Sequence, residues 1–177
     1  ATSVIVVSET IITAVTPAGT AGVSDVVVTT VGGTATGAFS YIDIVEPTGV
    51  AASDGTSTSQ IAVTWNATPN AIAYQVWRDA QKIADIASGA TTSYNDAAGT
   101  LIPGTLYTYT VKAEFTAGVS GPSTGDTGFR KLSAPTSVAC AVAQTGFVRI
   151  TWNAAVGATS YEILRNGTTI GTSPTTQ

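Results

Sequence analysis

The side chains that usually perform acid–base or nucleophilic chemistry are scarce in this chain of 177 residues. It has no histidine, one cysteine, 11 acidic residues and 7 basic residues. Without histidine, neither the familiar Ser or Cys nucleophile paired with His nor an imidazole metal site can form. Carboxylates that could pair for glycoside hydrolysis, such as Asp79 and Asp85, flank a predicted hairpin, where aspartate is ordinary. We therefore predict no catalytic residue and no enzyme activity.

Cofactor and metal motifs are absent as well. No glycine-rich phosphate loop precedes a helical pattern, and the acidic residues lack the spacing of a calcium loop. A single cysteine excludes an internal disulfide framework and a metal cluster built from cysteines alone. We predict no cofactor and no bound metal, the remaining alternative being a calcium ion at an interdomain turn.

The one cysteine, Cys140, lies in an alternating segment that places Val138, Cys140 and Val142 on one face of a strand. This pattern predicts a small apolar residue buried in a core. A reactive thiol is the alternative, but it would need a cationic neighbour, and none stands nearby in sequence.

Composition points to β-structure with many turns. The chain is 44% hydrophobic and only 10% charged, with 18 glycines and no methionine. No apolar run approaches the roughly 18 residues that a membrane helix requires. The net charge is -4 and the basic residues are scattered, so we predict neither a membrane span nor a nucleic-acid partner.

An internal repeat organises the chain. The segment 61–67 (IAVTWNA) recurs as 148–154 (VRITWNA), and the same offset carries Tyr74 onto Tyr161. The distance along the chain between the two copies, from residue 61 to residue 148, matches the length of one β-sandwich domain of roughly 100 residues and is too long for a solenoid repeat. Alternation and turn residues predict strands at 11–15, 25–30, 49–52, 60–66, 73–78, 82–86, 91–94, 105–115, 161–165 and 168–171.

Several residues of this pattern resemble fibronectin type III modules. Pro47 stands where that family opens its first strand, Trp65 where it places a core tryptophan, and 74–78 (YQVWR) where it has its third strand. Tyr107 resembles the family's corner tyrosine, which bonds to upstream backbone. The resemblance implies a complete module at 45–131 and the N-terminal part of a second at 132–177. It also implies these core residues: Trp65, Tyr74, Val76, Tyr107, Tyr109, Val111, Trp152 and Tyr161.

Residues 1–44 follow another pattern. The segments 10–22 (TIITAVTPAGTAG), 25–30 (DVVVTT) and 39–41 (FSY) resemble the C-terminal half of an IPT/TIG domain, a further immunoglobulin-like fold. The expected fold class is therefore all-β, with tandem immunoglobulin-like sandwiches. Both terminal modules match only part of a domain, which predicts either a longer protein or exposed edges completed by another chain. We favour the longer protein.

Trp77 is the candidate for surface binding. Alternation places Tyr74 and Val76 on one face of the strand and Gln75 and Trp77 on the other, while Trp65 already supplies the core tryptophan. A tryptophan outside the core could contact a glycan or a protein partner. The alternative, which we favour, is packing over a neighbouring side chain such as Lys112 or against an adjoining domain.

The expected function is non-catalytic. Short linkers with proline at 45–47 and 131–135 predict a semi-rigid spacer, and repeated modules can form a multivalent binding surface. Such modules resemble those of bacterial adhesins and of bacteriophage tails, fibres and capsid decorations. The expected location is extracellular, on a bacterial cell surface or a virion surface. The expected partners are neighbouring proteins of the surface assembly or virion and, as a further candidate, cell-surface glycans.

Two other settings remain open. The same modules can be accessory spacers of a secreted polysaccharide-degrading enzyme whose catalytic domain lies elsewhere. An animal receptor or matrix segment is the other, and it would predict disulfides or glycans on the sequon residues Asn66 and Asn166.

Overall fold

The computed structural model describes residues 3–16, 19–141 and 146–174, and these form β-strands and no helix. The predicted all-β class is thus confirmed. It follows that the described part of the chain holds no helix able to cross a membrane. The chain divides into two compact units, Ala1–Val45 and Glu46–Gln177. The further boundary that we predict at residues 131 and 132 stays a prediction.

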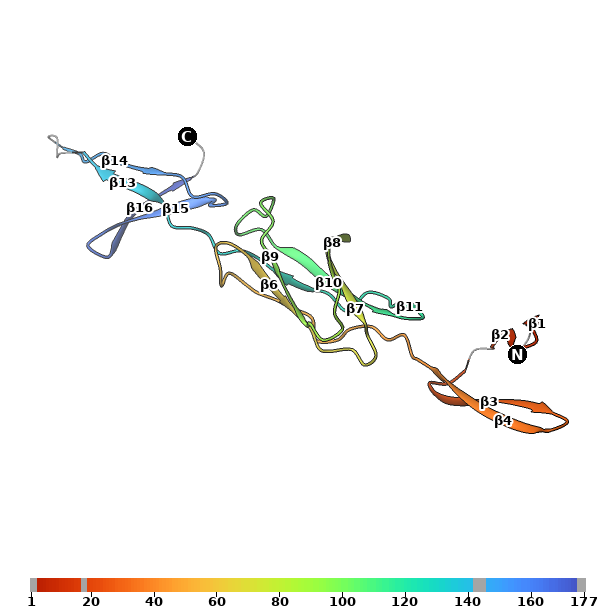
Figure 1. Cartoon of the computed structure of the whole chain (residues 1–177). Helices are drawn as coiled ribbons and strands as arrows, with labels where there is room; N and C mark the ends of the chain where they lie inside the picture. Colours follow the sequence, from red (N-terminus) through yellow and green to blue (C-terminus); the bar gives the residue numbers. More distant parts are fainter. Residues whose placement is uncertain (1–2, 17–18, 142–145, 175–177) are drawn as a thin grey trace. The chain divides into compact units, whose positions relative to one another are not determined.

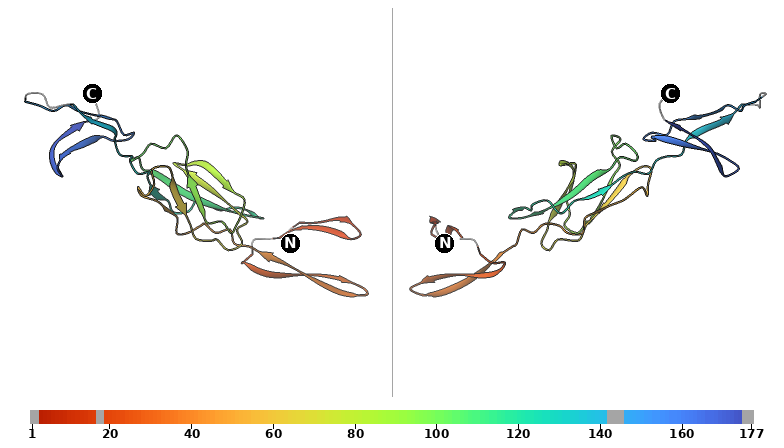
Figure 2. Two further views of the ribbon diagram at one scale, coloured as in Figure 1. Left: turned by 60° about the vertical axis from the view of Figure 1, so that its left-hand side comes forward. Right: turned by 180° about the vertical axis from the view of Figure 1, so that it is seen from behind.

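The first unit contains two antiparallel hairpins. Strand β1 (Ser3–Ser8) pairs with β2 (Ile11–Val15), and β3 (Gly22–Thr30) pairs with β4 (Gly33–Tyr41), the long ribbon seen in Figure 2. Paired residues of a ladder share a face, so Val26 and Val28 lie beside Gly37 and Ala35 on one apolar side. Hairpins of this kind occur in many β-folds, and the IPT/TIG likeness stays a prediction. The expected turn at Pro17 and Ala18 lies outside the described residues.

The second unit contains a complete sandwich, which we call the middle module (Figure 1). Both of its sheets are antiparallel. One sheet has the order β11-β10-β7-β8, with β12 also pairing to β10, and the other has the order β5-β6-β9. The strands of the first sheet are β7 (Ala73–Arg78), β8 (Gln81–Ile86), β10 (Tyr107–Phe115), β11 (Gly118–Val119) and β12 (Asp126–Gly128). Those of the second are β5 (Ala51–Ala52), β6 (Ile61–Thr64) and β9 (Ser93–Asp96).

The core of the middle module lies between these sheets because each strand alternates inward and outward side chains. Along β10, every second residue from Tyr109 to Phe115 is buried and those between are half-buried. The rings of Trp65 and Tyr74 meet edge to face with centroids 5.4 Å apart. The buried hydrophobic residues are Ala52, Ile61, Val63, Trp65, Tyr74, Val76, Leu101, Tyr109, Val111, Ala113 and Phe115.

The second copy of the repeat reproduces the local contacts of the first. Strand β13 (Thr136–Cys140) pairs with β14 (Ile150–Asn153), and β15 (Ser160–Arg165) pairs with β16 (Thr168–Pro174). The rings of Trp152 and Tyr161 lie 5.3 Å apart, and the Tyr161 hydroxyl accepts a 2.8 Å hydrogen bond from the backbone NH of Ala155. The Tyr74 hydroxyl accepts the equivalent 2.8 Å bond from Thr68.

Trp152 and Tyr161 are nevertheless only half-buried, and their assignment to a core stays a prediction. In the middle module, the matching residues Trp65 and Tyr74 are buried in one core cluster with residues of β9 and β10. Among the described residues, the second copy has no strands equivalent to those two. Its aromatic pair therefore packs locally without being closed off from solvent.

Cys140 corrects a prediction, because its thiol is exposed and not buried. It lies on the apolar side expected from alternation and lines an open groove together with Val138, Ile150, Trp152 and Tyr161. The groove is open because, among the described residues, the second copy has no strands equivalent to β9 and β10. Val142, the third residue of the predicted face, lies outside the described residues.

Candidate functional site

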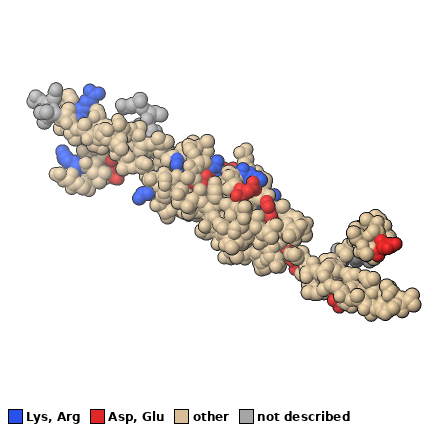
Figure 3. Space-filling view, viewed as in Figure 1, with Lys and Arg blue, Asp and Glu red and all other residues tan. Residues whose placement is uncertain are grey.

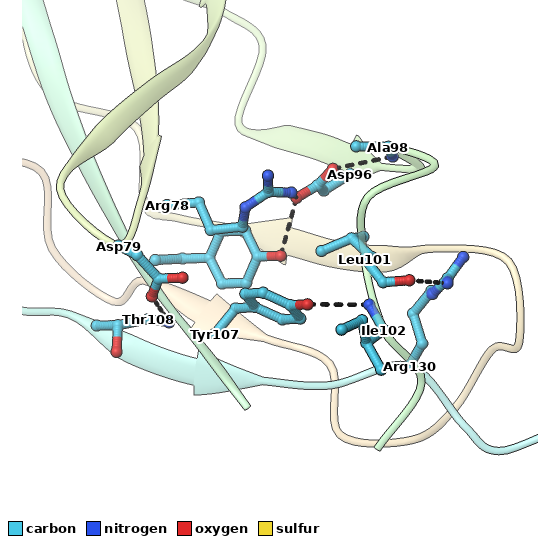
Figure 4. A network of polar contacts seen from close by, with 10 residues as sticks. Arg78, Asp79, Asp96, Ala98, Leu101, Ile102, Tyr107, Thr108 and Arg130 are labelled. Atoms are coloured by element: carbon cyan, nitrogen blue, oxygen red, sulfur yellow. Dashed lines mark hydrogen bonds and ion pairs between the residues drawn. The ribbon is translucent and has the colours of Figure 1, made fainter. Parts of the chain in front are cut away.

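A buried carboxylate is the centre of the main polar network in the middle module (Figure 4). Asp96, the last residue of β9, is only 1% exposed. Its Oδ2 accepts hydrogen bonds from Arg78 Nη1 at 2.6 Å and from the Tyr109 hydroxyl at 2.9 Å. Its Oδ1 accepts a 3.1 Å bond from the backbone NH of Ala98. Both oxygens thus have donors, as a buried charge requires.

Tyr107 joins this network to the loop that precedes β10. The guanidinium carbon of Arg78 lies 5.4 Å from the centroid of the Tyr107 ring. The Tyr107 hydroxyl accepts a 2.9 Å hydrogen bond from the backbone NH of Ile102, which is the geometry expected of a corner tyrosine. Tyr107 itself is half-buried, whereas Tyr109 on the same strand is fully buried. Nearby, Arg130 donates to the Leu101 carbonyl.

The electrostatics of the network suit a structural role. Burial, together with the hydrogen bond and negative charge of Asp96, raises the pKa of Tyr109 well above its ordinary value of 10.0. Burial and the charge of Asp96 also raise the pKa of Tyr94. Both phenols therefore stay protonated near neutral pH, so neither can serve as a base there.

Trp77 lies on the opposite side of β7 from the core, where we expected it, and is half-buried. Its Nε1 donates a 3.2 Å hydrogen bond to Gln75 Oε1, and Gln75 Nε2 donates a 2.6 Å bond to Glu114 Oε1. The ammonium of Lys112 lies 4.6 Å from the centroid of the indole ring. The packing over Lys112 that we favoured is therefore present, and a binding role for Trp77 stays a prediction.

Two charged residues of β8 extend this surface. Lys82 lies opposite Trp77 in the β7–β8 ladder, and its Nζ contacts the two carboxylate oxygens of Asp85 at 2.8 and 2.9 Å. Figure 3 shows both signs of charge close together over β7, β8 and β10. We define the outer face as Gln75, Trp77, Lys82, Asp85, Lys112 and Glu114; its two lysines balance its two acids.

The two acidic residues at the predicted hairpin each have a partner in the structure. Asp85 is bound to Lys82, and Asp79 Oδ1 accepts a 2.9 Å hydrogen bond from the backbone NH of Thr108. Over residues 3–16, 19–141 and 146–174, His, Cys, Asp and Glu side chains nowhere gather in threes that could hold a metal ion. The carboxylates near this hairpin therefore have structural partners.

Sequence reasoning missed Asp96, although one signal was available. Tyr94 and Asp96 alternate onto the same side of β9, so an inward tyrosine predicts an inward aspartate. An inward carboxylate requires a cation or several donors. Arg78, already noted in the third-strand pattern, is that cation.

The strand order and the corner tyrosine decide the kind of sandwich that the chain contains. A sheet β5-β6-β9 faces a sheet β8-β7-β10-β11. Tyr107, the first residue of β10, accepts a hydrogen bond from the backbone NH of Ile102 in the preceding loop. The middle module is fibronectin type III-like. No protein-family model matches the sequence.

One curated relative is the poly(3-hydroxybutyrate) depolymerase of Ralstonia pickettii, which is 46% identical over 78 residues. The match covers 44% of this chain and only 15% of the length of that enzyme.

Similar solved structures include an Fn3-like protein from Clostridium thermocellum. It is 31% identical, with 51% of this chain and 97% of that chain covered and a TM-score of 0.42. The FN1–FN3 domains of chicken CNTN1 are 16% identical, with 71% of this chain and 49% of that chain covered and a TM-score of 0.45.

Proposed function

We propose that this chain is a non-catalytic accessory segment of an extracellular bacterial protein that degrades an insoluble polymer. The observation that carries the proposal is the 46% identity to a stretch amounting to 15% of a polymer-degrading enzyme. A match to so small a part of the enzyme is what a module accompanying a separate catalytic domain would give. The relative's name supports a polyester substrate in place of the polysaccharide that the sequence suggested.

The interior chemistry of the middle module agrees with an accessory role. Asp96 forms an ion pair with Arg78 and accepts a hydrogen bond from Tyr109, so these three groups bind one another inside the module. A carboxylate with both oxygens occupied in the core has no free position for a substrate. The module therefore contributes a stable body and an outer surface.

A structural or adhesive role on a bacterial or bacteriophage surface is the second candidate. The tandem repeat favours it, because repeated modules add weak contacts that increase avidity. The two candidates differ in what accompanies these modules in the native polypeptide.

Two measurements test the proposed function. The purified chain should release no soluble product from poly(3-hydroxybutyrate) or from polysaccharides, and hydrolysis by the chain alone would overturn the proposal. Intact mass and peptide mapping of the protein from its native source should then reveal a catalytic domain in the same polypeptide. Finding only further sandwich modules with a cell-wall or virion anchor would favour the second candidate.

A further inference from the structure

We propose that the outer face around Trp77 binds an extended, uncharged polyester chain. This inference rests on the proposed accessory function and names the surface that would touch the polymer. It assigns a role to an aromatic residue that the core does not use, since the core contact is between Trp65 and Tyr74.

The indole ring of Trp77 is held ready for stacking. Its Nε1 is bonded to Gln75, which is bonded in turn to Glu114 on β10, so the ring edge is fixed from two strands. Fixing the ring before binding lowers the entropy lost when a ligand stacks on it. Tryptophan also offers a large apolar area for the CH groups of an aliphatic polyester.

Lysines flank the ring on both neighbouring strands. Lys82 lies opposite Trp77 on β8, and the ammonium of Lys112 from β10 lies over the ring. An exposed ion pair and a surface cation–π contact are both weak, so either ammonium can move to a new acceptor. When Lys112 moves aside, the ring face becomes available and its ammonium can donate to an ester carbonyl.

The balance of donors and acceptors favours a polyester over a polysaccharide. A polyester offers carbonyl acceptors and no donors, which matches the two ammonium groups. Sugar hydroxyls also need acceptors, but Glu114 already accepts from Gln75, which leaves Asp85, once Lys82 has moved, as the one free carboxylate of the outer face. With two lysines and two acids, the outer face attracts neither a polyanion nor a polycation.

Retention of the whole chain on poly(3-hydroxybutyrate) particles, with cellulose particles as comparison, tests the inference. The wild type should be retained on the polyester and not on cellulose. Trp77→Ala should weaken retention about tenfold, whereas Trp77→Phe, which keeps a stacking ring, should retain most of it. Leu164→Ala is the matched control, because Leu164 holds the equivalent position in the second copy; it should leave retention unchanged.

Equal retention of the wild type and Trp77→Ala, or equal retention on cellulose, would overturn the inference. A wild type that does not bind the polyester would overturn it too, while the accessory function would still be decided by peptide mapping. Thermal unfolding checks that each variant is folded. If Trp77→Ala is not folded, Lys112→Glu is tested in its place, because this variant keeps the Trp77 ring and its carboxylate repels ester carbonyls. Weaker retention supports the inference, and unchanged retention overturns it.

Discussion

At the scale of single residues, Asp96 links three strands of the middle module through Arg78 on β7 and Tyr109 on β10. Replacing it by Asn removes the negative charge and leaves the Arg78 guanidinium, 18% exposed, without its counter-ion. We expect Asp96→Asn to lower the free energy of unfolding by about 3 kcal/mol, as for other broken buried pairs. Urea unfolding monitored by circular dichroism measures the difference.

The control for this prediction is Asp85→Asn. Asp85 also pairs with a cation, but in an exposed ion pair, so its loss should cost less than about 1 kcal/mol. If the two substitutions cost the same, the network around Asp96 does not stabilise the module as we describe.

Tyr109 makes the stability of the middle module depend on pH in the alkaline range. Because burial and Asp96 raise its pKa above 10.0, the folded state keeps a proton that the unfolded chain releases near pH 10. Its contribution is therefore complete below pH 10 and is lost as the pH rises further, towards the raised pKa of the folded state. We expect unfolding midpoints in urea to fall above pH 10, and to fall less steeply for Tyr109→Phe. A slope unchanged by this substitution would contradict the assignment.

At the scale of elements, the β7–β8 turn contains backbone strain that one substitution can relieve. Asp79 and Ala80 have φ values of 48° and 64°, and the equivalent Asn166 and Gly167 have 51° and 80°. Two positive φ values match the turn that prefers Asn-Gly, and alanine pays a steric cost that glycine does not. We expect Ala80→Gly to raise the free energy of unfolding by about 0.5 kcal/mol.

The measurement is again urea unfolding, with Ala87→Gly as the control. Ala87 is exposed and is not among the described residues with positive φ, so glycine there adds only freedom to the unfolded chain. It should leave stability unchanged or lower it slightly. Destabilisation by Ala80→Gly would show that the turn is not strained.

At the scale of the whole molecule, the backbone amides of the two repeat copies should differ in their protection from hydrogen exchange, although the local contacts of the copies agree. The backbone of β10 lies between β7 and both β11 and β12, whereas β13–β16 form separate two-stranded ladders among the described residues. Two-stranded ladders are marginal in water. In hydrogen exchange of this chain, we expect β10 amides to be protected far longer than those of β14 and β15. Equal protection would show that the second copy is covered by contacts that the structure does not contain.

The middle module should also fold by itself. Its buried hydrophobic residues all lie between Ala52 and Phe115, so its core needs no residue from outside 45–131. We expect a polypeptide of residues 45–131 to unfold in one cooperative transition, at the midpoint of the main transition of the whole chain. A midpoint lowered by more than a few degrees would show that neighbouring segments stabilise it.

The sequence by itself determined the features that depend on local periodicity. Alternating side chains located the long strands, the repeat located the Trp and Tyr pairs, and the position of Trp77 away from the core followed from the residues beside it. The lack of histidine limited the acid–base and metal chemistry open to the chain, whatever its fold. These inferences need only composition and neighbouring residues, which the sequence supplies directly.

Only the tertiary structure decided which side chains are covered and which charges meet. Asp96 lies 18 residues from Arg78 and 13 from Tyr109, and sheet pairing brings these groups together. The short strands β11 and β12 exist because β10 offers an edge to pair with. Cys140, Trp152 and Tyr161 carry the pattern of core residues yet remain accessible. Alternation sets the direction of a side chain, whereas burial requires a second layer to lie over it.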